Sequence, residues 1–135
     1  MRFFTDRHGF PGYESDEPRH TALGVWFQME LRNSPYQCLD LLAILDDVAA
    51  GRADEREWDG EAFLVTVTRP GVTVRNTILP DQHGRYELTE VRRLAEEYWE
   101  YLSDQPRPRL AFDLADWERT WSRTHPCRGR LFPAV

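Results

Sequence analysis

The chain has 135 residues with a formal net charge of −6, and 41% of its residues are hydrophobic. This length predicts one domain with enough chain to bury a core, and the absence of any apolar run near 20 residues excludes a membrane span. Because the N-terminal stretch also lacks the apolar segment of a secretory signal, we expect a cytoplasmic protein. The two cysteines, Cys38 and Cys127, are expected to be reduced thiols without a special role.

The first elements in chain order are two strands separated by an acidic loop. Residues 1–6 form a short apolar stretch, and a Gly- and Pro-containing loop follows. In residues 20–31 every second residue is apolar, which predicts a half-buried strand (Leu23, Val25, Phe27, Met29 and Leu31). Trp26 then points to the opposite face of the sheet. We expect the C-terminal segment to cover it.

Residues 34–51 carry the clearest helix signals. Ser34 is a candidate N-cap, Pro35 suits the first helical position and Gly51 suits the end. Apolar residues at spacings of three and four form one stripe (Cys38, Leu41, Leu42, Leu45, Val48 and Ala49). The pattern places Asp46 and Asp47 on the exposed C-terminal half of the helix.

A charged link, residues 51–61, follows the helix. Residues 63–79 predict two strands that pair as a hairpin about a turn at Pro70-Gly71. A second helix is predicted over residues 88–102, with Thr89 as candidate N-cap. After a Pro-rich break, a short helix over 113–123 aligns three apolar residues, and an irregular tail ends the chain (Leu114, Trp117 and Trp121).

These elements predict an α+β fold of order ββαββα plus a C-terminal segment. An antiparallel four-stranded sheet with both long helices on one face gives a two-layer sandwich. We expect residues 1–104 to form the domain and the Pro- and Arg-rich extension, residues 105–135, to pack on it. The extension would cover the second face of the sheet, including Trp26.

The pattern His20-x-x-x-Gly24-x-Trp26-Phe27-x-x-Glu30 resembles a stretch of the small bacterial YacL-like proteins, a family of uncharacterised function. The following helix, the Trp58-x-Gly60 motif and the 63–79 hairpin occur in the same order in that family. The similarity covers residues 20–102. The family's longer acidic segment before the last helix is shortened here, and the family lacks the tail after Ser103. The resemblance therefore implies the fold more than an activity.

No motif points to catalysis or to a cofactor. The histidines show no metal-ligand spacing, and Cys127 follows His125 in a Gly- and Pro-containing tail rather than on a rigid element (the histidines are His8, His20, His83 and His125). The sequence contains no phosphate-binding Gly loop and no serine elbow. We therefore expect a protein that is not an enzyme and that holds neither metal nor cofactor.

The charge distribution points to a basic protein partner. Residues 105–135 hold six arginines against three carboxylates, a balance of +3, which leaves −9 on residues 1–104. An acidic body repels nucleic acids and anionic membranes and attracts basic proteins, although acidity also simply keeps a domain in solution. The candidate partner-binding residues are carboxylates and the tryptophans among them (Asp46, Asp47, Asp54, Glu55, Glu57, Trp58, Asp59, Glu61, Glu96, Glu97, Trp99 and Glu100).

Two functions fit these observations. The first is a bacterial immunity protein, an antitoxin of a polymorphic toxin system, that binds a cognate basic toxin and blocks its active site. The second is a housekeeping or regulatory protein-binding module of the YacL-like kind, which forms a homodimer through the open face of its sheet. A toxin domain encoded immediately upstream would favour the first.

Overall fold

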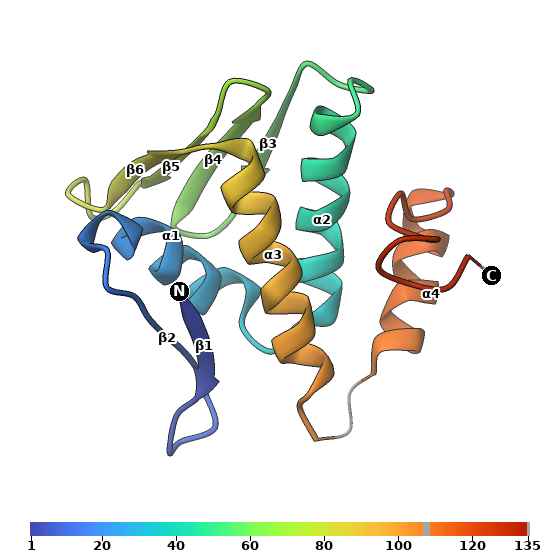
Figure 1. Ribbon diagram of the computed structural model, residues 1–135, viewed down its shortest axis with the longest axis horizontal. Coiled ribbons are helices and arrows are strands. Elements are labelled where there is room, and N and C mark those ends of the chain that lie inside the picture. Colours follow the sequence, from blue (N-terminus) through green and yellow to red (C-terminus); the bar gives the residue numbers. More distant parts are fainter. Residues whose placement is uncertain (107–108, 135) are drawn as a thin grey trace.

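A computed structural model describes residues 1–106 and 109–134 (Figure 1). It contains one two-stranded and one four-stranded antiparallel sheet together with helices, which confirms the α+β class. In Figure 1 the larger sheet lies at the upper left, with α2 and α3 beside it and α4 at the far right. The long helix α2, Pro35–Ala49, contacts the sheet on one side and both α3 and α4.

Helix α2 forms as its caps predict. The backbone N–H of Gln37 donates to the Ser34 side chain at 3.2 Å, Pro35 occupies the first turn, and Gly51 ends the segment at φ +79°. The left-handed backbone conformation at this position favours glycine, because glycine lacks a Cβ. Buried residues lie on more than one side of the helix. They include Leu39 and all of the predicted stripe except Ala49, which is half-buried. Asp47 is buried too, contrary to the prediction of a solvated acidic end.

The predicted hairpin is also confirmed. Strand β4, Phe63–Thr68, pairs with β5, Val72–Asn76, around the Pro70-Gly71 turn. The inward side chains are buried, as the alternation predicts (Phe63, Val65, Val67, Val72 and Val74). Ile78, which falls within the range predicted for the second strand, lies beyond β5 and is 70% exposed.

Two strands that the sequence pattern did not predict complete the sheet, which has the order β3-β4-β5-β6. Strand β3, Glu55–Asp59, lies within the expected charged link, and β6, His83–Tyr86, lies between the predicted hairpin and the second predicted helix. Both are edge strands, and each buries a single side chain on the helix side, Trp58 and Tyr86. Edge strands carry charged side chains because one of their faces and one of their edges remain in water.

The prediction of a strand over residues 20–31 is wrong. This segment is helical: a 3₁₀ turn at Pro18–His20, helix α1 at Thr21–Trp26, and a π-helical segment, η2, at Phe27–Leu31. The alternating pattern competes here with a helical one, since the fully buried residues fall at spacings of three and four (Leu23, Trp26, Phe27 and Leu31). Met29, which alternation places in the core, is 48% exposed.

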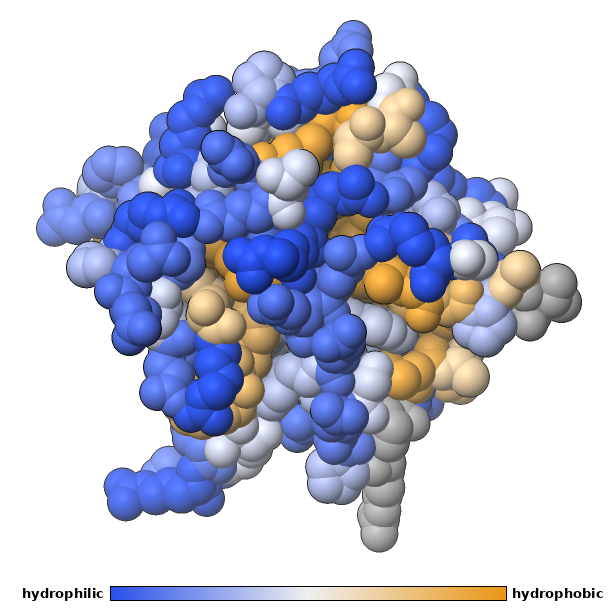
Figure 2. All heavy atoms as spheres, viewed as in Figure 1, coloured by the Kyte–Doolittle hydropathy of each residue, from blue (hydrophilic) through white to orange (hydrophobic). Residues whose placement is uncertain are grey.

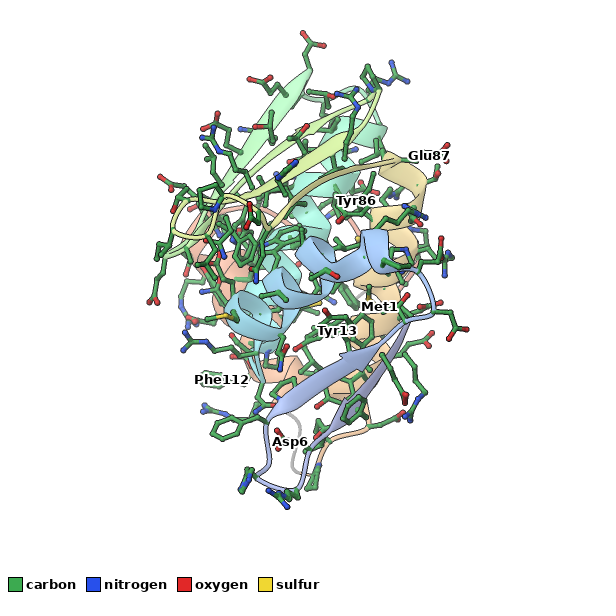
Figure 3. All side chains as sticks on the ribbon, turned by 90° about the vertical axis from the view of Figure 1, so that its left-hand side faces the viewer. Met1, Asp6, Tyr13, Tyr86, Glu87 and Phe112 are labelled. Atoms are coloured by element: carbon green, nitrogen blue, oxygen red, sulfur yellow. The ribbon has the colours of Figure 1, made fainter. Side chains whose placement is uncertain are left out.

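The N-terminal residues form a separate hairpin under α1. Strand β1, Arg2–Thr5, which the sequence predicts, pairs with β2, Pro11–Glu14, which lies in the expected loop. Figure 3 shows Tyr13 of this hairpin directed at α1. A Cβ on Gly24 would overlap the Tyr13 ring, so a glycine is needed where hairpin and helix meet. The Phe3 ring packs edge-on against Tyr98 of α3 at 4.9 Å.

Helix α3, Leu88–Ser103, matches its prediction except at its start. Glu87, rather than Thr89, is the N-cap, and its side chain makes no capping hydrogen bond.

Helix α4, Leu110–Trp121, packs on α2. Trp26 therefore does not lie under the C-terminal segment. It is covered by Phe27 and Trp58, at ring distances of 5.1 and 5.9 Å. Within the part of the chain that the structure describes, side chains on the second face of the sheet stay exposed or half-buried.

Candidate functional site

The C-terminal segment, residues 110–134, folds back on the acidic end of α2 through ion pairs. Arg123 contacts Asp47 with both terminal nitrogens, at 2.9 and 3.0 Å, and Arg52 donates to the same carboxylate at 2.8 Å. Asp46 pairs with Arg52 and with Arg92 of α3. Burial alone would raise the pKa of Asp47, but the hydrogen bonds from Arg123 and Arg52 hold it below its ordinary value.

Four of the twelve candidate residues are therefore engaged within the protein. Asp46 and Asp47 belong to this network, and Glu96 pairs with Arg130 of the tail. Trp99 is 7% exposed, and its ring meets Phe132 of the tail at 5.0 Å. The tail occupies this acidic surface, so these four side chains are not a free surface for another protein.

Two further candidates lie on α3. Glu97 pairs with Arg93 one turn earlier at 3.2 Å, and both side chains are largely in water. Glu100 is exposed. An exposed pair of this kind contributes only about 0.3–0.5 kcal/mol, so it neither shapes the surface nor withholds Glu97 from a partner.

The remaining six candidates lie together on β3 and in the residues beside it. The Trp58 side chain is buried, whereas the other five are exposed (Asp54, Glu55, Glu57, Asp59 and Glu61). Glu61 stands 3.7 Å from Arg32 with both side chains mostly in water. Within the described ranges the other four carboxylates form no ion pair.

A groove of about 580 Å³ runs between the end of β3, the η2 segment and the start of α2. Its walls carry carboxylates from three parts of the chain and one arginine, Arg32 (the carboxylates are Glu30, Asp40, Glu57, Asp59 and Glu61). Four apolar side chains also line it (Met29, Leu31, Ile44 and Trp58). The groove therefore combines a negative rim with apolar surface, and we take it as the candidate site.

The Glu30 carboxylate joins the two sides of the groove. It accepts hydrogen bonds from the Trp58 indole N–H at 3.0 Å and from the backbone N–H groups of Ala62 and Phe63 at 2.8 and 3.1 Å. A Cβ on Gly60 would overlap this carboxylate. The sequence patterns do not single out Glu30 as a site residue. Glu30 belongs to one motif and Trp58 and Gly60 to another, and the contact of Glu30 with Trp58 connects the two motifs.

Asp40 contributes a half-buried carboxyl to the groove. Burial raises its pKa, while a hydrogen bond from the Trp117 indole N–H at 3.3 Å acts in the opposite direction. Asp40 therefore links the groove to α4. A cation that enters the groove would favour the ionised form of this carboxyl.

A second polar cluster lies at the start of α1. The ring of buried His20 is hydrogen-bonded to the Ser15 hydroxyl at 2.6 Å through Nδ1 and to Glu90 at 3.3 Å through Nε2. Ser15 also accepts the Glu17 N–H, and Arg19 holds Glu90 from the other side. These bonds connect the loop before α1 to α3. The pattern of a serine, a histidine and a carboxylate here serves to fix the loop, since every member is engaged within the fold.

Among residues 1–106 and 109–134, no cluster of three or more His, Cys, Asp or Glu side chains is arranged to hold a metal ion. Over the same ranges no helix is long and apolar enough to span a bilayer. Figure 2 shows a mostly hydrophilic face with apolar side chains between the polar ones. Comparison of the chain with protein-family models, curated proteins and solved structures finds no match.

Proposed function

We propose that this protein is a non-catalytic binding protein that takes up a basic surface of another protein at the groove beside β3. The form of this function that we favour is an immunity protein, which binds a cognate toxin domain and covers its active site. The single observation that carries the proposal is the groove itself, whose rim carries four more carboxylates than arginines.

The distribution of paired and unpaired charge supports this location. At the C-terminal segment the carboxylates already have arginine partners, whereas Glu57 and Asp59 on β3 have none within the described chain. Unpaired carboxylates leave a negative potential that accelerates association with a basic partner. A nucleic acid or an anionic membrane would be repelled by the same potential.

The groove suits an inserted side chain of the partner. Trp58 was expected to protrude as an aromatic anchor, but it is only 6% exposed and its indole is bonded to Glu30. Its exposed part forms groove surface together with Met29. A partner arginine fits such a place, because its stem packs on apolar surface while its guanidinium meets carboxylates.

The alternative is the regulatory module that acts as a homodimer. It is favoured by a different observation, the open face of the four-stranded sheet, which no helix covers in the described chain. That face carries its own charge pattern.

Co-purification of the tagged protein with the product of its upstream gene tests the proposed function. We expect a stoichiometric complex whose association slows as salt rises, because exposed charges are screened. The double substitution Asp59→Arg with Glu61→Arg should weaken this complex.

Glu100→Arg is the matched control, since it changes an exposed carboxylate on α3 and should leave binding intact. Recovery of the protein without the upstream product would overturn the immunity proposal. Loss of the complex with Glu100→Arg, but not with the groove variant, would move the interface to α3.

A further inference from the structure

The outer face of the four-stranded sheet is open along its whole width. The helices contact the sheet from the side on which Trp58, Val65, Val74 and Tyr86 are buried. Side chains on the other side are exposed or half-buried. In the described chain no element therefore covers the outer face of the sheet.

The strand register arranges the outer face in rows across the sheet. One row runs from β3 to β6 through directly paired residues, in the order Glu57, Thr66, Thr73 and Arg85. The next row is Asp59, Leu64, Arg75 and His83. In both rows the carboxylate lies at the β3 edge and the basic residues lie toward the β6 edge.

Within residues 1–106 and 109–134 the charged side chains on this face form no ion pairs. Ten arginines form ion pairs elsewhere in the described chain. Arg75 and Arg85 form none there, and neither do Glu57 and Asp59, because the two signs stand at opposite edges of the sheet. A surface with unpaired negative charge at one edge and unpaired positive charge at the other is complementary to a second copy whose edges lie in the opposite order.

We propose that the outer face binds a second copy of this chain, with the two-fold axis parallel to the strands. A two-fold rotation about an axis in the plane between two facing sheets exchanges their edges when the axis runs along the strands. It then places β3 of one copy over β6 of the other, and carboxylates meet basic side chains. An axis across the strands would instead stack β3 on β3 and bring like charges together.

The strand register determines which residues face each other in this dimer. Glu57 of each copy lies opposite Arg85 of the other, and Asp59 lies opposite His83. The short side chains of Thr66 and Thr73 occupy the middle, where sheets pack about 10 Å apart, a gap that an arginine and a glutamate can bridge from opposite sides.

The dimer should be weak and sensitive to salt. Four strands about 4.8 Å apart and about five residues long present only a few hundred Å² per copy, below the usual size of a stable interface. The outer face also shares Glu57 and Asp59 with the groove rim, so the dimer and a basic partner compete for β3. The dimer gives the homodimer alternative a definite set of contacts, and it does not depend on the binding of a toxin because it forms from this protein alone.

Sedimentation velocity of the purified protein at low and high salt tests the dimer. Wild type should associate reversibly at low salt and become monomeric as salt rises. Glu57→Arg and Arg85→Glu should each raise the dissociation constant by about tenfold or more, because each replaces two attractive contacts with two repulsive ones.

The pairing itself is tested by recombining these substitutions. The double variant Glu57→Arg with Arg85→Glu should dimerise again, and an equimolar mixture of the two single variants should form a heterodimer. Glu100→Arg and Arg7→Glu are controls that change the same charges elsewhere and should not alter association. A monomeric wild type at low salt, single variants that dimerise like wild type, or a double variant that stays monomeric would each overturn the proposal.

Discussion

Arg123 and Asp47 form a two-hydrogen-bond ion pair, at 2.9 and 3.0 Å, that fastens the C-terminal segment to the end of α2. The Asp47 side chain is 6% exposed, whereas that of Arg123 is 37% exposed. The pair thus combines a buried acceptor with a donor reached from the surface. It explains why an arginine-rich tail and an acidic body occur in one chain: much of the positive charge of the tail is used inside the molecule.

Arg123→Ala should lower the free energy of unfolding by about 1–2 kcal/mol. The value stays below the 3–5 kcal/mol of a fully broken buried pair, because Arg52 remains bonded to Asp47. Urea denaturation measures it. Arg119→Ala is the control, since that side chain forms only an exposed pair with Asp116 and should cost less than about 0.5 kcal/mol. Equal effects of the two substitutions would contradict the role of Arg123.

Both thiols should resist labelling in the folded protein. Cys38 and Cys127 are fully buried, and burial raises the pKa of both thiols, that of Cys127 to about 11. Because the thiolate is the reactive form, a disulfide-exchange reagent at about pH 8 should label neither thiol until urea unfolds the chain. Arg123→Ala should accelerate labelling of Cys127 more than labelling of Cys38. Fast labelling of native wild type would contradict the packing of the C-terminal segment.

The sequence predicts helix α2 and the β4–β5 hairpin because their signals are local. Ser34, Pro35 and the Pro70-Gly71 turn act through neighbouring backbone groups, so a short window contains the relevant physics. The helix at residues 20–31 was missed because its apolar residues satisfy both the two-residue and the helical period. Only tertiary contacts, such as Tyr13 against Gly24, decide between them.

Only part of the candidate site was predicted, because tertiary contacts also bring its residues together. The carboxylates of β3 are visible as a charged run, but the run does not reveal that it is an edge strand held by one buried residue, Trp58. The groove also needs residues 29–32, and no pattern in the sequence brings them beside β3. Net charge could not separate Asp47, which the tail neutralises, from Asp59, which stays free of ion pairs in the described chain.

Acidification should weaken the fold through His125. Its Nε2 is hydrogen-bonded to the Leu39 carbonyl at 2.8 Å, so it carries the proton, and Nδ1 accepts the Cys127 N–H at 3.1 Å. Burial lowers the pKa of this ring. In the unfolded chain the His125 ring takes up a proton near pH 6.5, whereas in the folded chain it does so only at lower pH. The contribution of the neutral ring to the free energy of unfolding is therefore complete above pH 6.5. Below pH 6.5 this free energy decreases by at most about 1.4 kcal/mol per pH unit.

Urea midpoints at about pH 8 and about pH 5.5 measure this dependence. His125→Gln removes the titrating ring, so the difference between its two midpoints should be smaller than in wild type. His8→Gln is the control, because His8 is exposed in the first loop and should leave the wild-type difference unchanged. A difference in His125→Gln as large as in wild type would assign the pH dependence to another group.

Gly60→Ala should destabilise the protein by about 2 kcal/mol. The added Cβ would displace the Glu30 carboxylate, which is held by the Trp58 indole and by two backbone N–H groups, and these donors would lose their acceptor in a partly buried place. Glu30→Ala should cost a similar amount, and the double substitution should cost much less than the sum, because both changes remove one set of hydrogen bonds. Strictly additive costs in urea denaturation would show that Gly60 is required for some reason other than the approach of Glu30.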